Sequence, residues 1–160
     1  MTEHDPIKAE KINNLNLWRE NKESLAVEWI DNESREKNRI IKQGELYTCQ
    51  LGENIGHEQC KERPVLIISD SRYNNNGIVI GIPLTSTVLL DTRVTDRKKP
   101  KILTHYVLRK QNYSYLKNDS TINSTQVRSI STIRLQKYLG SISESDLNAV
   151  KIRLRTAFGL

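Results

Sequence analysis

The chemically richest stretch of the sequence is a polar segment that leads into an apolar run, GHEQCKERPVLIIS, over residues 56–69. Proline biases the residue before it toward an extended backbone, so Pro64 directs Arg63 into a strand. A guanidinium fixed at the mouth of a strand presents a fork of donors that suits a phosphate group. The alternative interpretation is that Arg63 forms a structural ion pair with Glu58 or Glu62.

A second polar group, Thr85-Ser86-Thr87, directly follows the apolar run GIVIGIPL. Hydroxyl groups at the end of a strand can bind a phosphate oxygen or orient a nucleophile. Serine and threonine also form turns, and that role is the alternative for this group. Thr85 and Ser86 are therefore candidates for a phosphate site.

A third polar group lies in the segment QVRSI, residues 126–130, whose residue types alternate as in a strand. Such alternation places Gln126 and Arg128 on one face, with Val127 and Ile130 roughly on the other. The polar face can bind RNA, or it can simply be solvated.

No metal or cofactor motif accompanies these groups. The sequence holds no Walker loop, HExxH motif, nucleophile elbow or GxGxxG, and its histidines, His4, His57 and His105, are scattered. Cys49 and Cys60 have neither zinc-site spacing nor the number needed for a disulfide framework. We therefore expect an activity that uses polar and charged side chains without a metal or cofactor, in a reducing cytoplasm.

The positive charge of the sequence is concentrated in its larger, second part. Residues 1–42 carry 8 basic and 9 acidic side chains, whereas residues 43–160 carry 17 basic and 10 acidic ones, a net charge of +7. A surplus of lysine and arginine favours a polyanionic partner, because phosphate contacts release condensed counterions. A solvated basic surface is the alternative. We expect no membrane partner, because no signal-peptide core and no apolar run of about 18 residues occurs.

Residues 43–160 read as short strands separated by turns. The expected strands are ELYTCQL, PVLIIS, GIVIGIPL, KILTHYVL and STINSTQVRSI, with loops at residues 74–77, 91–101 and 117–119. The continuously apolar PVLIIS is typical of a central strand that is buried on both faces.

The end of the sequence predicts a helix. Ser143 and Asp146 resemble a capping box, and the apolar stripe that follows it is Leu147, Val150, Leu154 and Phe158. The expected fold class is therefore α+β, a small, strongly bent antiparallel sheet or partly open barrel with helices at its ends. A length of 160 residues fits one such domain and an appendage.

Residues 1–42 are expected to be that appendage, a helical amino-terminal extension. Large apolar residues recur at helical spacing, namely Ile12, Leu15, Trp18, Leu25, Ala26 and Trp29. The helix is either continuous or broken near Asn21, and residues 31–42 either extend it or form a linker.

Several of these segments, taken in order, resemble the successive signatures of the MazF/PemK toxin family. They are GELY at residues 44–47, GHEQCKERPVLIIS, IPLTS at residues 82–86, and TQVRSI at residues 125–130 followed by Arg134 and Leu135. The resemblance covers roughly residues 43–160, and the block G-x-E-Q-x-x-x-R-P is its most specific part. It implies a MazF/CcdB-like, SH3-like β-barrel with a carboxy-terminal helix.

The resemblance also implies roles for individual residues. Arg63 falls on the catalytic arginine of the family, and Thr85 falls on its catalytic hydroxyl. The substrate-binding residues that it implies are His57, Glu58, Gln59, Ser86, Gln126 and Arg128. Of these, Glu58 and Gln59 match a loop that closes over the site, while Gln126 and Arg128 match a polar strand that faces the RNA and the dimer partner.

The function that the resemblance implies is that of a type II toxin, a metal-independent endoribonuclease or mRNA interferase. It would cleave single-stranded RNA through the 2′-hydroxyl and leave 2′,3′-cyclic phosphate and 5′-hydroxyl ends. The implied partners are a cognate acidic antitoxin, a second copy of the chain and, only through the antitoxin complex, DNA. Two other functions stay open: a catalytically silent RNA-binding relative, and a CcdB-like gyrase-binding toxin, whose end the tail Phe158-Gly159-Leu160 resembles.

Some features depart from the family. Cys60 and Lys61 stand where the family often has glycines, and the insertion at residues 91–101 is long, so the RNA sequence that is cut does not follow from the resemblance. Residues 1–42 have no counterpart in the minimal toxin. Their apolar stripe either packs on the chain's own barrel, or their acidic side, with Glu20, Glu23 and Glu28, covers the basic RNA groove as a restraint.

Overall fold

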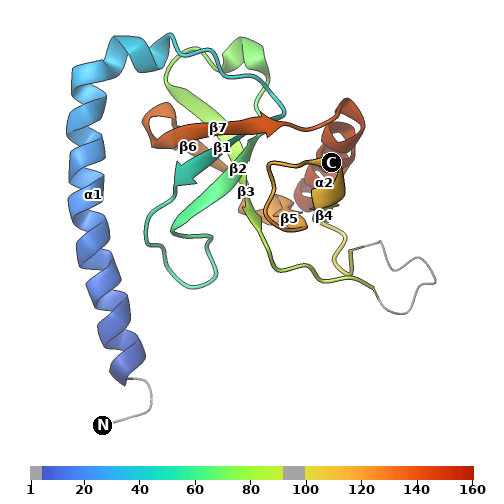
Figure 1. Ribbon diagram of the computed structural model, residues 1–160, viewed down its shortest axis with the longest axis horizontal. Coiled ribbons are helices and arrows are strands. Elements are labelled where there is room, and N and C mark those ends of the chain that lie inside the picture. The colour runs from blue at the N-terminus through green and yellow to red at the C-terminus, as the bar shows by residue number, and fades with distance from the viewer. Residues whose placement is uncertain (1–4, 92–99) are drawn as a thin grey trace.

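The computed structural model describes residues 5–91 and 100–160 of the chain. A long amino-terminal helix stands on one side of a bent antiparallel sheet, and a shorter carboxy-terminal helix lies on the other side (Figure 1). This arrangement confirms the expected α+β class. Of the expected loop at residues 91–101, positions 92–99 lie outside the described residues.

The elements of the described part follow one another in a simple order. The helices are α1 (Asp5–Lys37) and α2 (Glu144–Phe158), and the 3-10 turns are η1 (Ser71–Tyr73), η2 (Lys110–Asn112), η3 (Ser124–Gln126) and η4 (Thr132–Arg134). The strands are β1 (Glu45–Gln50), β2 (Glu62–Ile67), β3 (Ile78–Thr85), β4 (His105–Leu108), β5 (Ser120–Asn123), β6 (Arg128–Ser131) and β7 (Leu135–Ser141).

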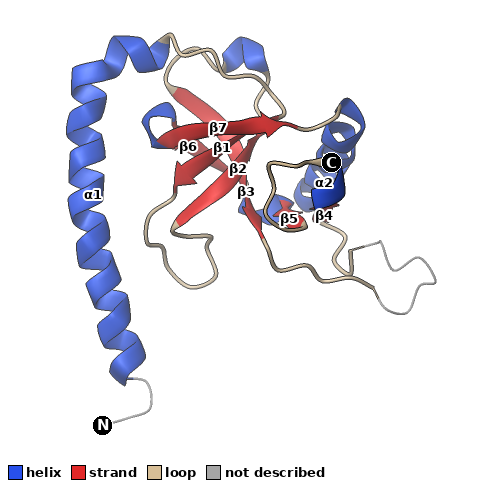
Figure 2. Cartoon of the chain, in the orientation of Figure 1, coloured by secondary structure: helices blue, strands red, loops and turns tan. Residues whose placement is uncertain are grey.

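The sheet is organised around β3. The strand order is β4-β5-β3-β2-β1-β7, and β6 also pairs with β3. The first half of β3 pairs with β6 and its last residues pair with β5, so the sheet changes direction along this strand (Figure 2). No pairing within the described residues joins β4 to β7, so the strands form the strongly bent antiparallel sheet that was expected and do not close into a barrel.

Strand β2 is buried on both faces, as its apolar sequence predicted. Leu66 belongs to the core cluster beneath α2, whereas Val65 and Ile67 belong to a second cluster on the opposite face, and all three are fully buried. β1 and β3 lie within one residue of their expected positions, and β2 begins and ends two residues earlier than expected, so the centre of the sheet is a rigid support for the residues at its ends.

Two of the expected strands are wrong in extent. Of KILTHYVL, only His105–Leu108 is a strand. The run from residue 120 to 130 is interrupted by η3, because the Asn123 side chain accepts hydrogen bonds from the backbone and hydroxyl of Thr125 and turns the chain. Gln126 therefore lies in a 3-10 turn and not on a strand with Arg128.

Strand β7 was not expected from the sequence. Its burial does not alternate, since the three residues from Gln136 to Tyr138 are all exposed. A strand without a regular apolar period gives no signal that distinguishes it from a loop. It forms because β1 offers it a partner, with Tyr47 opposite Tyr138 and Cys49 opposite Leu135.

The carboxy-terminal helix begins as predicted. The Ser143 hydroxyl caps α2 by accepting a hydrogen bond of 3.1 Å from the backbone N–H of Asp146. Val150 is fully buried, and Leu147 and Leu154 pack against the same core cluster. The predicted stripe is wrong at its end, because Phe158, the last residue of the helix, is 61% exposed.

Helix α1 is longer than its apolar stripe predicted, and its only non-helical residue is Asn32. The expected alternative of a break near Asn21 is therefore wrong, and residues 31–37 extend the helix. The Asn32 side chain donates a hydrogen bond of 2.9 Å to the Glu28 carbonyl and so competes with the helix backbone there. Figure 1 shows the helix turning near this point.

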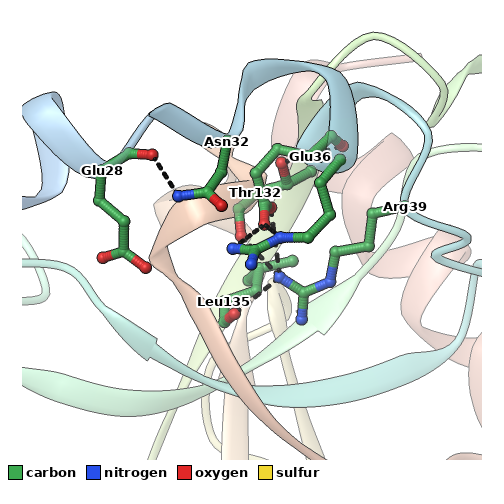
Figure 3. Close-up of polar contacts among 7 residues, drawn as sticks. Glu28, Asn32, Glu36, Arg39, Thr132 and Leu135 are labelled. Atoms are coloured by element: carbon green, nitrogen blue, oxygen red, sulfur yellow. Dashed lines mark hydrogen bonds and ion pairs between the residues drawn. The ribbon is translucent and has the colours of Figure 1, made fainter. Parts of the chain in front are cut away.

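The carboxy-terminal end of α1 is fixed to the sheet by a buried charge cluster (Figure 3). Glu36 is 4% exposed and forms ion pairs with Arg35 at 3.2 Å and Arg39 at 3.5 Å. Arg39 also donates to the carbonyls of Thr132 at 3.0 Å and Leu135 at 2.8 Å. The cluster therefore joins α1 to η4 and β7.

The rest of α1 packs on its own domain. Trp18 covers Gly52 and Trp29 covers Gly77, two glycines with positive φ at which a Cβ would lie 2.1 and 2.2 Å from the indole rings. The contact stripe differs from the expected one, since Lys11 and Asn14 are partly buried while Ile12 is 59% and Leu15 40% exposed. No helix within the described ranges is long and apolar enough to cross a membrane.

Candidate active site

Arg63 and Thr85 come from the neighbouring strands β2 and β3. Val65 pairs with Pro83 in the last pair of this ladder, and the same antiparallel register continued by two residues would bring Arg63 opposite Thr85. On its other edge Arg63 pairs with Cys49 of β1. Two positions along a strand return a side chain to the same face, so both side chains share a face with Val65 and Pro83.

Arg63 and Thr85 line one cavity of about 460 Å³ at the ends of β2 and β3. The complete lining is Thr48, Lys61, Glu62, Arg63, Pro64, Leu84, Thr85, Ser86, Tyr115, Leu116, Lys117, Asn118, Ser120 and Leu139. Two of the predicted groups, Arg63 and Thr85-Ser86, therefore meet here. The lining carries three cations and one carboxylate, which is a charge balance that favours a phosphate.

The guanidinium of Arg63 is held from one side. Its Nε donates a hydrogen bond of 2.7 Å to the Cys60 carbonyl. Among residues 5–91 and 100–160, no carboxylate lies within ion-pairing distance of Arg63. The alternative interpretation of Arg63 as the partner of Glu58 or Glu62 in an ion pair is therefore wrong. No hydrogen bond within the described residues engages the two terminal nitrogens of Arg63, so they remain available as donors.

The Thr85 hydroxyl does form a turn, which was its alternative role. It accepts a hydrogen bond of 3.3 Å from the backbone N–H of Thr87, and the buried Thr121 donates to the Thr87 carbonyl at 2.8 Å. A hydroxyl that accepts from a backbone N–H still has its own proton to donate. The turn therefore fixes the oxygen of Thr85 and leaves its proton for a ligand in the cavity.

Gln126, from the third predicted group, lies in η3 and contacts the loop of residues 51–61 that precedes Arg63. The Gln126 side chain accepts from the backbone N–H of Gln59 at 3.1 Å and donates to the His57 carbonyl at 3.3 Å. The Gln59 side-chain oxygen is buried and has no hydrogen-bond partner within the described part of the chain. A buried acceptor without a partner is costly, and such groups are frequent at functional sites.

Five of the predicted residues do not line the cavity, namely His57, Glu58, Gln59, Gln126 and Arg128. Glu58 is exposed, and Arg128 is partly buried on β6 behind the site. Burial raises the pKa of the Cys49 thiol from 9.0 to about 12, and the charges of Arg134 and Arg128 oppose this shift. Arg128 thus lies near Cys49 on the inner side of the sheet, and neither it nor Glu58 lines the cavity.

Sequence reasoning missed several of the cavity's residues. Lys117 and Tyr115 come from the segment after β4, which carried no motif, and burial raises the pKa of Tyr115 far above its usual range, so it stays protonated. Lys61 has a φ of 67°, the left-handed conformation that favours glycine. The sequence could have indicated this backbone conformation, because Lys61 stands at a position where the MazF/PemK family often has glycine.

Within the described ranges, no group of three or more His, Cys, Asp or Glu side chains is placed to bind a metal ion.

Comparison with known proteins relates the second part of the chain to one family. The family described as PemK-like, MazF-like toxin of type II toxin-antitoxin system matches residues 42–158. The endoribonuclease MazF of Staphylococcus epidermidis is 31% identical over 121 residues, which are 76% of this chain and 93% of that protein.

Solved structures share the fold at lower identity. MazF (Form-I) from Deinococcus radiodurans is 20% identical, with a TM-score of 0.60 over 76% of this chain and 99% of that one. An endoribonuclease in complex with its cognate antitoxin from Mycobacterial species is 23% identical, with a TM-score of 0.57 over 75% and 96% of the two chains.

Proposed function

The chain belongs to the PemK-like, MazF-like toxin family of type II toxin-antitoxin systems, and we propose that it cleaves single-stranded RNA at the cavity between β2 and β3. It is a MazF-like toxin endoribonuclease. The single observation that supports the location is that Arg63 and Thr85, from neighbouring strands, line the same cationic cavity.

The proposed reaction uses the nucleophile that RNA itself carries. The 2′-oxygen of one ribose forms a bond to the adjacent phosphorus and loses its proton, while the bond to the 5′-oxygen breaks and that oxygen takes up a proton. The products are a 2′,3′-cyclic phosphate and a free 5′-hydroxyl. This step requires in-line geometry and stabilisation of the negative charge that builds up on the phosphoryl oxygens.

Arg63 supplies that stabilisation in this proposal. Its two terminal nitrogens can bind both non-bridging oxygens, since Nε is already held by the Cys60 carbonyl. An arginine pKa above about 12 makes the side chain a poor proton donor, so its role is electrostatic. Thr85 and Ser86 donate their hydroxyl protons to the phosphate or orient the 2′-hydroxyl, and Lys61 and Lys117 add positive charge.

We propose two protein partners from family membership and charge. The net charge of +7 on residues 43–160 suits an acidic antitoxin, whose disordered segment would fold on the basic surface and compete with RNA. DNA would be reached only through that complex. A second copy of the chain would complete a homodimer, which sedimentation at micromolar concentration tests: a monomer that still cleaves RNA would contradict it.

The test of the chemistry is cleavage of a single-stranded RNA in excess EDTA. The wild type is expected to leave 5′-hydroxyl ends, which a kinase labels without prior phosphatase treatment. Arg63→Ala is expected to lower the rate by about 10²–10³, the usual effect of removing one donor to a developing oxyanion. The matched control is Arg72→Ala, because Arg72 pairs with Asp70 on the surface.

Three results would reject parts of the proposal. Strict dependence on Mg²⁺ would reject the mechanism, and full activity of Arg63→Ala would remove that residue from the site. RNA that is bound but never cut by the wild type would indicate a silent RNA-binding relative.

A further inference from the structure

Helix α1 contacts the loop between β1 and β2, residues 51–61, at two places. The Lys11 ammonium binds the Glu53 carboxylate and the Asn54 carbonyl. Two helical turns later, Trp18 covers Gly52, whose positive φ and lack of a Cβ leave room for the indole ring. Residues seven positions apart share one face of a helix, so α1 meets the loop along a single stripe.

Trp18 also joins the loop to the turn η4. The guanidinium of Arg134 lies over the Trp18 ring at 5.5 Å from its centroid, which is a cation-π distance. The same guanidinium donates to the carbonyls of Gln50 at 3.3 Å and Leu51 at 3.4 Å. The first residues of the loop are therefore enclosed between α1 and η4.

The contacts continue to the end of the loop that reaches the cavity. The Asn54 side chain donates to the Gln59 carbonyl at 2.6 Å, and the backbone N–H of Lys61 donates to the Gly52 carbonyl at 2.6 Å. The next link is the Cys60 carbonyl, which accepts from Arg63. A continuous series of contacts thus leads from Lys11 and Trp18 to the residues beside the cavity.

The helix itself is firmly anchored. Its far end is fixed by the buried Glu36 and by Arg39, and Trp29 rests on Gly77. No residue of α1 lines the cavity with Arg63 and Thr85, so the helix does not block it.

The acidic side of α1 does not face the cavity either. Glu20 and Glu23 are exposed and border a shallow surface on the helix together with Asp31. The interpretation of α1 as an acidic restraint over the RNA groove therefore has no support in this arrangement. The contacts instead attach α1 to η4 at its carboxy-terminal end and to the loop of residues 51–61 nearer its amino-terminal end.

We propose that α1 is a positioning element of the RNA site, in which Lys11 and Trp18 hold the loop of residues 51–61 in the arrangement that binds RNA. The part of this inference that concerns RNA rests on the proposed function. Strand pairing keeps the backbones of Arg63 and Thr85 in place when the loop is released, and only the Cys60 carbonyl that holds the Arg63 side chain belongs to the loop, so the larger effect falls on RNA binding and the smaller one on the chemical step.

The test compares two tryptophan variants of the full chain, Trp18→Ala and Trp29→Ala. Both remove an indole from a positive-φ glycine, but only Gly52 belongs to the loop. Trp18→Ala is expected to speed amide hydrogen exchange in residues 53–60 by about tenfold or more, as local opening becomes easier. It is also expected to raise KM for a short RNA by about tenfold with kcat changed less than about twofold. Trp29→Ala is expected to change neither.

A lysine pair keeps the test decisive if Trp18→Ala does not fold. Lys11→Met removes the contacts to Glu53 and Asn54, whereas Lys8→Met removes only a surface pair with Asp5 and loses the same charge. Lys11→Met is expected to show the same two changes, and Lys8→Met neither.

The proposal is overturned if exchange in residues 53–60 is unchanged in Lys11→Met, if both members of a pair raise KM equally, or if kcat alone falls. Hydrogen exchange needs no RNA, so it separates this inference from the proposed function. If the loop loosens in the variants as expected but the wild type does not bind or cut RNA, the proposed function is wrong, whereas the role of α1 in holding the loop is supported.

Discussion

The backbone N–H of Gln59 donates a hydrogen bond of 3.1 Å to the side-chain oxygen of Gln126, across 67 residues of chain. The side-chain NH2 group of Gln126 donates to the His57 carbonyl at 3.3 Å, so the Gln126 side chain binds two backbone groups of the loop. Lys11 and Trp18 hold this loop from the opposite end. Its position beside the cavity therefore depends on segments that precede and follow it by many residues.

Replacing Gln126 by leucine is expected to weaken RNA binding. The substitution keeps the size of the side chain but removes both hydrogen bonds to the loop, each worth about 0.5–1.5 kcal/mol net. We expect KM for a short RNA to rise about tenfold, measured by steady-state cleavage, and the melting temperature to fall by a few degrees. Gln136→Leu on the exposed face of β7 is the control, and an equal effect of the two variants would contradict a role for Gln126.

Two substitutions at Thr85 separate its hydroxyl from its shape. Thr85→Val has the same volume without a proton to donate, and we expect kcat to fall by about 10²-fold, the lower range for one donor to an oxyanion. Thr85→Ser keeps the hydroxyl and is expected to keep most of the activity. Thr156→Val, on the exposed side of α2, controls for the loss of a hydroxyl elsewhere. Equal activity of the Val and Ser variants would remove Thr85 from the chemistry.

Two arginines that pair with the same carboxylate are expected to differ in their effect on stability. Arg39→Met leaves two backbone carbonyls without their donor and the buried Glu36 paired only with the exposed Arg35, and breaking such a buried pair costs about 3 kcal/mol or more of unfolding free energy. Arg35 is 64% exposed, so Arg35→Met is expected to cost less than about 1 kcal/mol. Urea unfolding of the variants measures both, and equal losses would reject the assignment.

The two cysteines are expected to react at very different rates. Burial raises the pKa of Cys49 to about 12, so its thiol is protonated at pH 8, whereas Cys60 is partly exposed in the loop. Iodoacetamide is therefore expected to label Cys60 in the native protein and Cys49 only after unfolding, as read by mass spectrometry. Labelling of Cys49 at the rate of Cys60 in the native protein would contradict this picture, and Cys60→Ser provides the blank.

The pKa of Cys49 also predicts a direction for stability at high pH. Its folded value lies above the value of 9.0 that an exposed thiol has. The unfolded chain therefore holds fewer protons between these two values, and the unfolding free energy falls as the pH rises from about 9 to about 12. Thermal unfolding across this range is expected to show a smaller pH-dependent loss in Cys49→Ala than in the parent.

Local sequence determined those features that depend on neighbours in the chain. The apolar run after Pro64 was enough to predict a strand buried on both faces, and Ser143 with Asp146 was enough to predict where α2 begins. Arg63 and Thr85 could be singled out because each stands at the end of such a strand. The strand and the start of the helix were predicted correctly because periodicity, proline and capping act within a few residues.

Other features were decided only by the tertiary structure. The meeting of Arg63 with Thr85 depends on the register of β2 against β3, and the entry of Lys117 and Tyr115 into the cavity depends on how the segment after β4 returns. The contact stripe of α1 includes Lys11 instead of Ile12, because Glu53 and the Asn54 carbonyl lie beside it. Contacts between residues distant in sequence are set by packing and pairing geometry, for which a local pattern carries no signal.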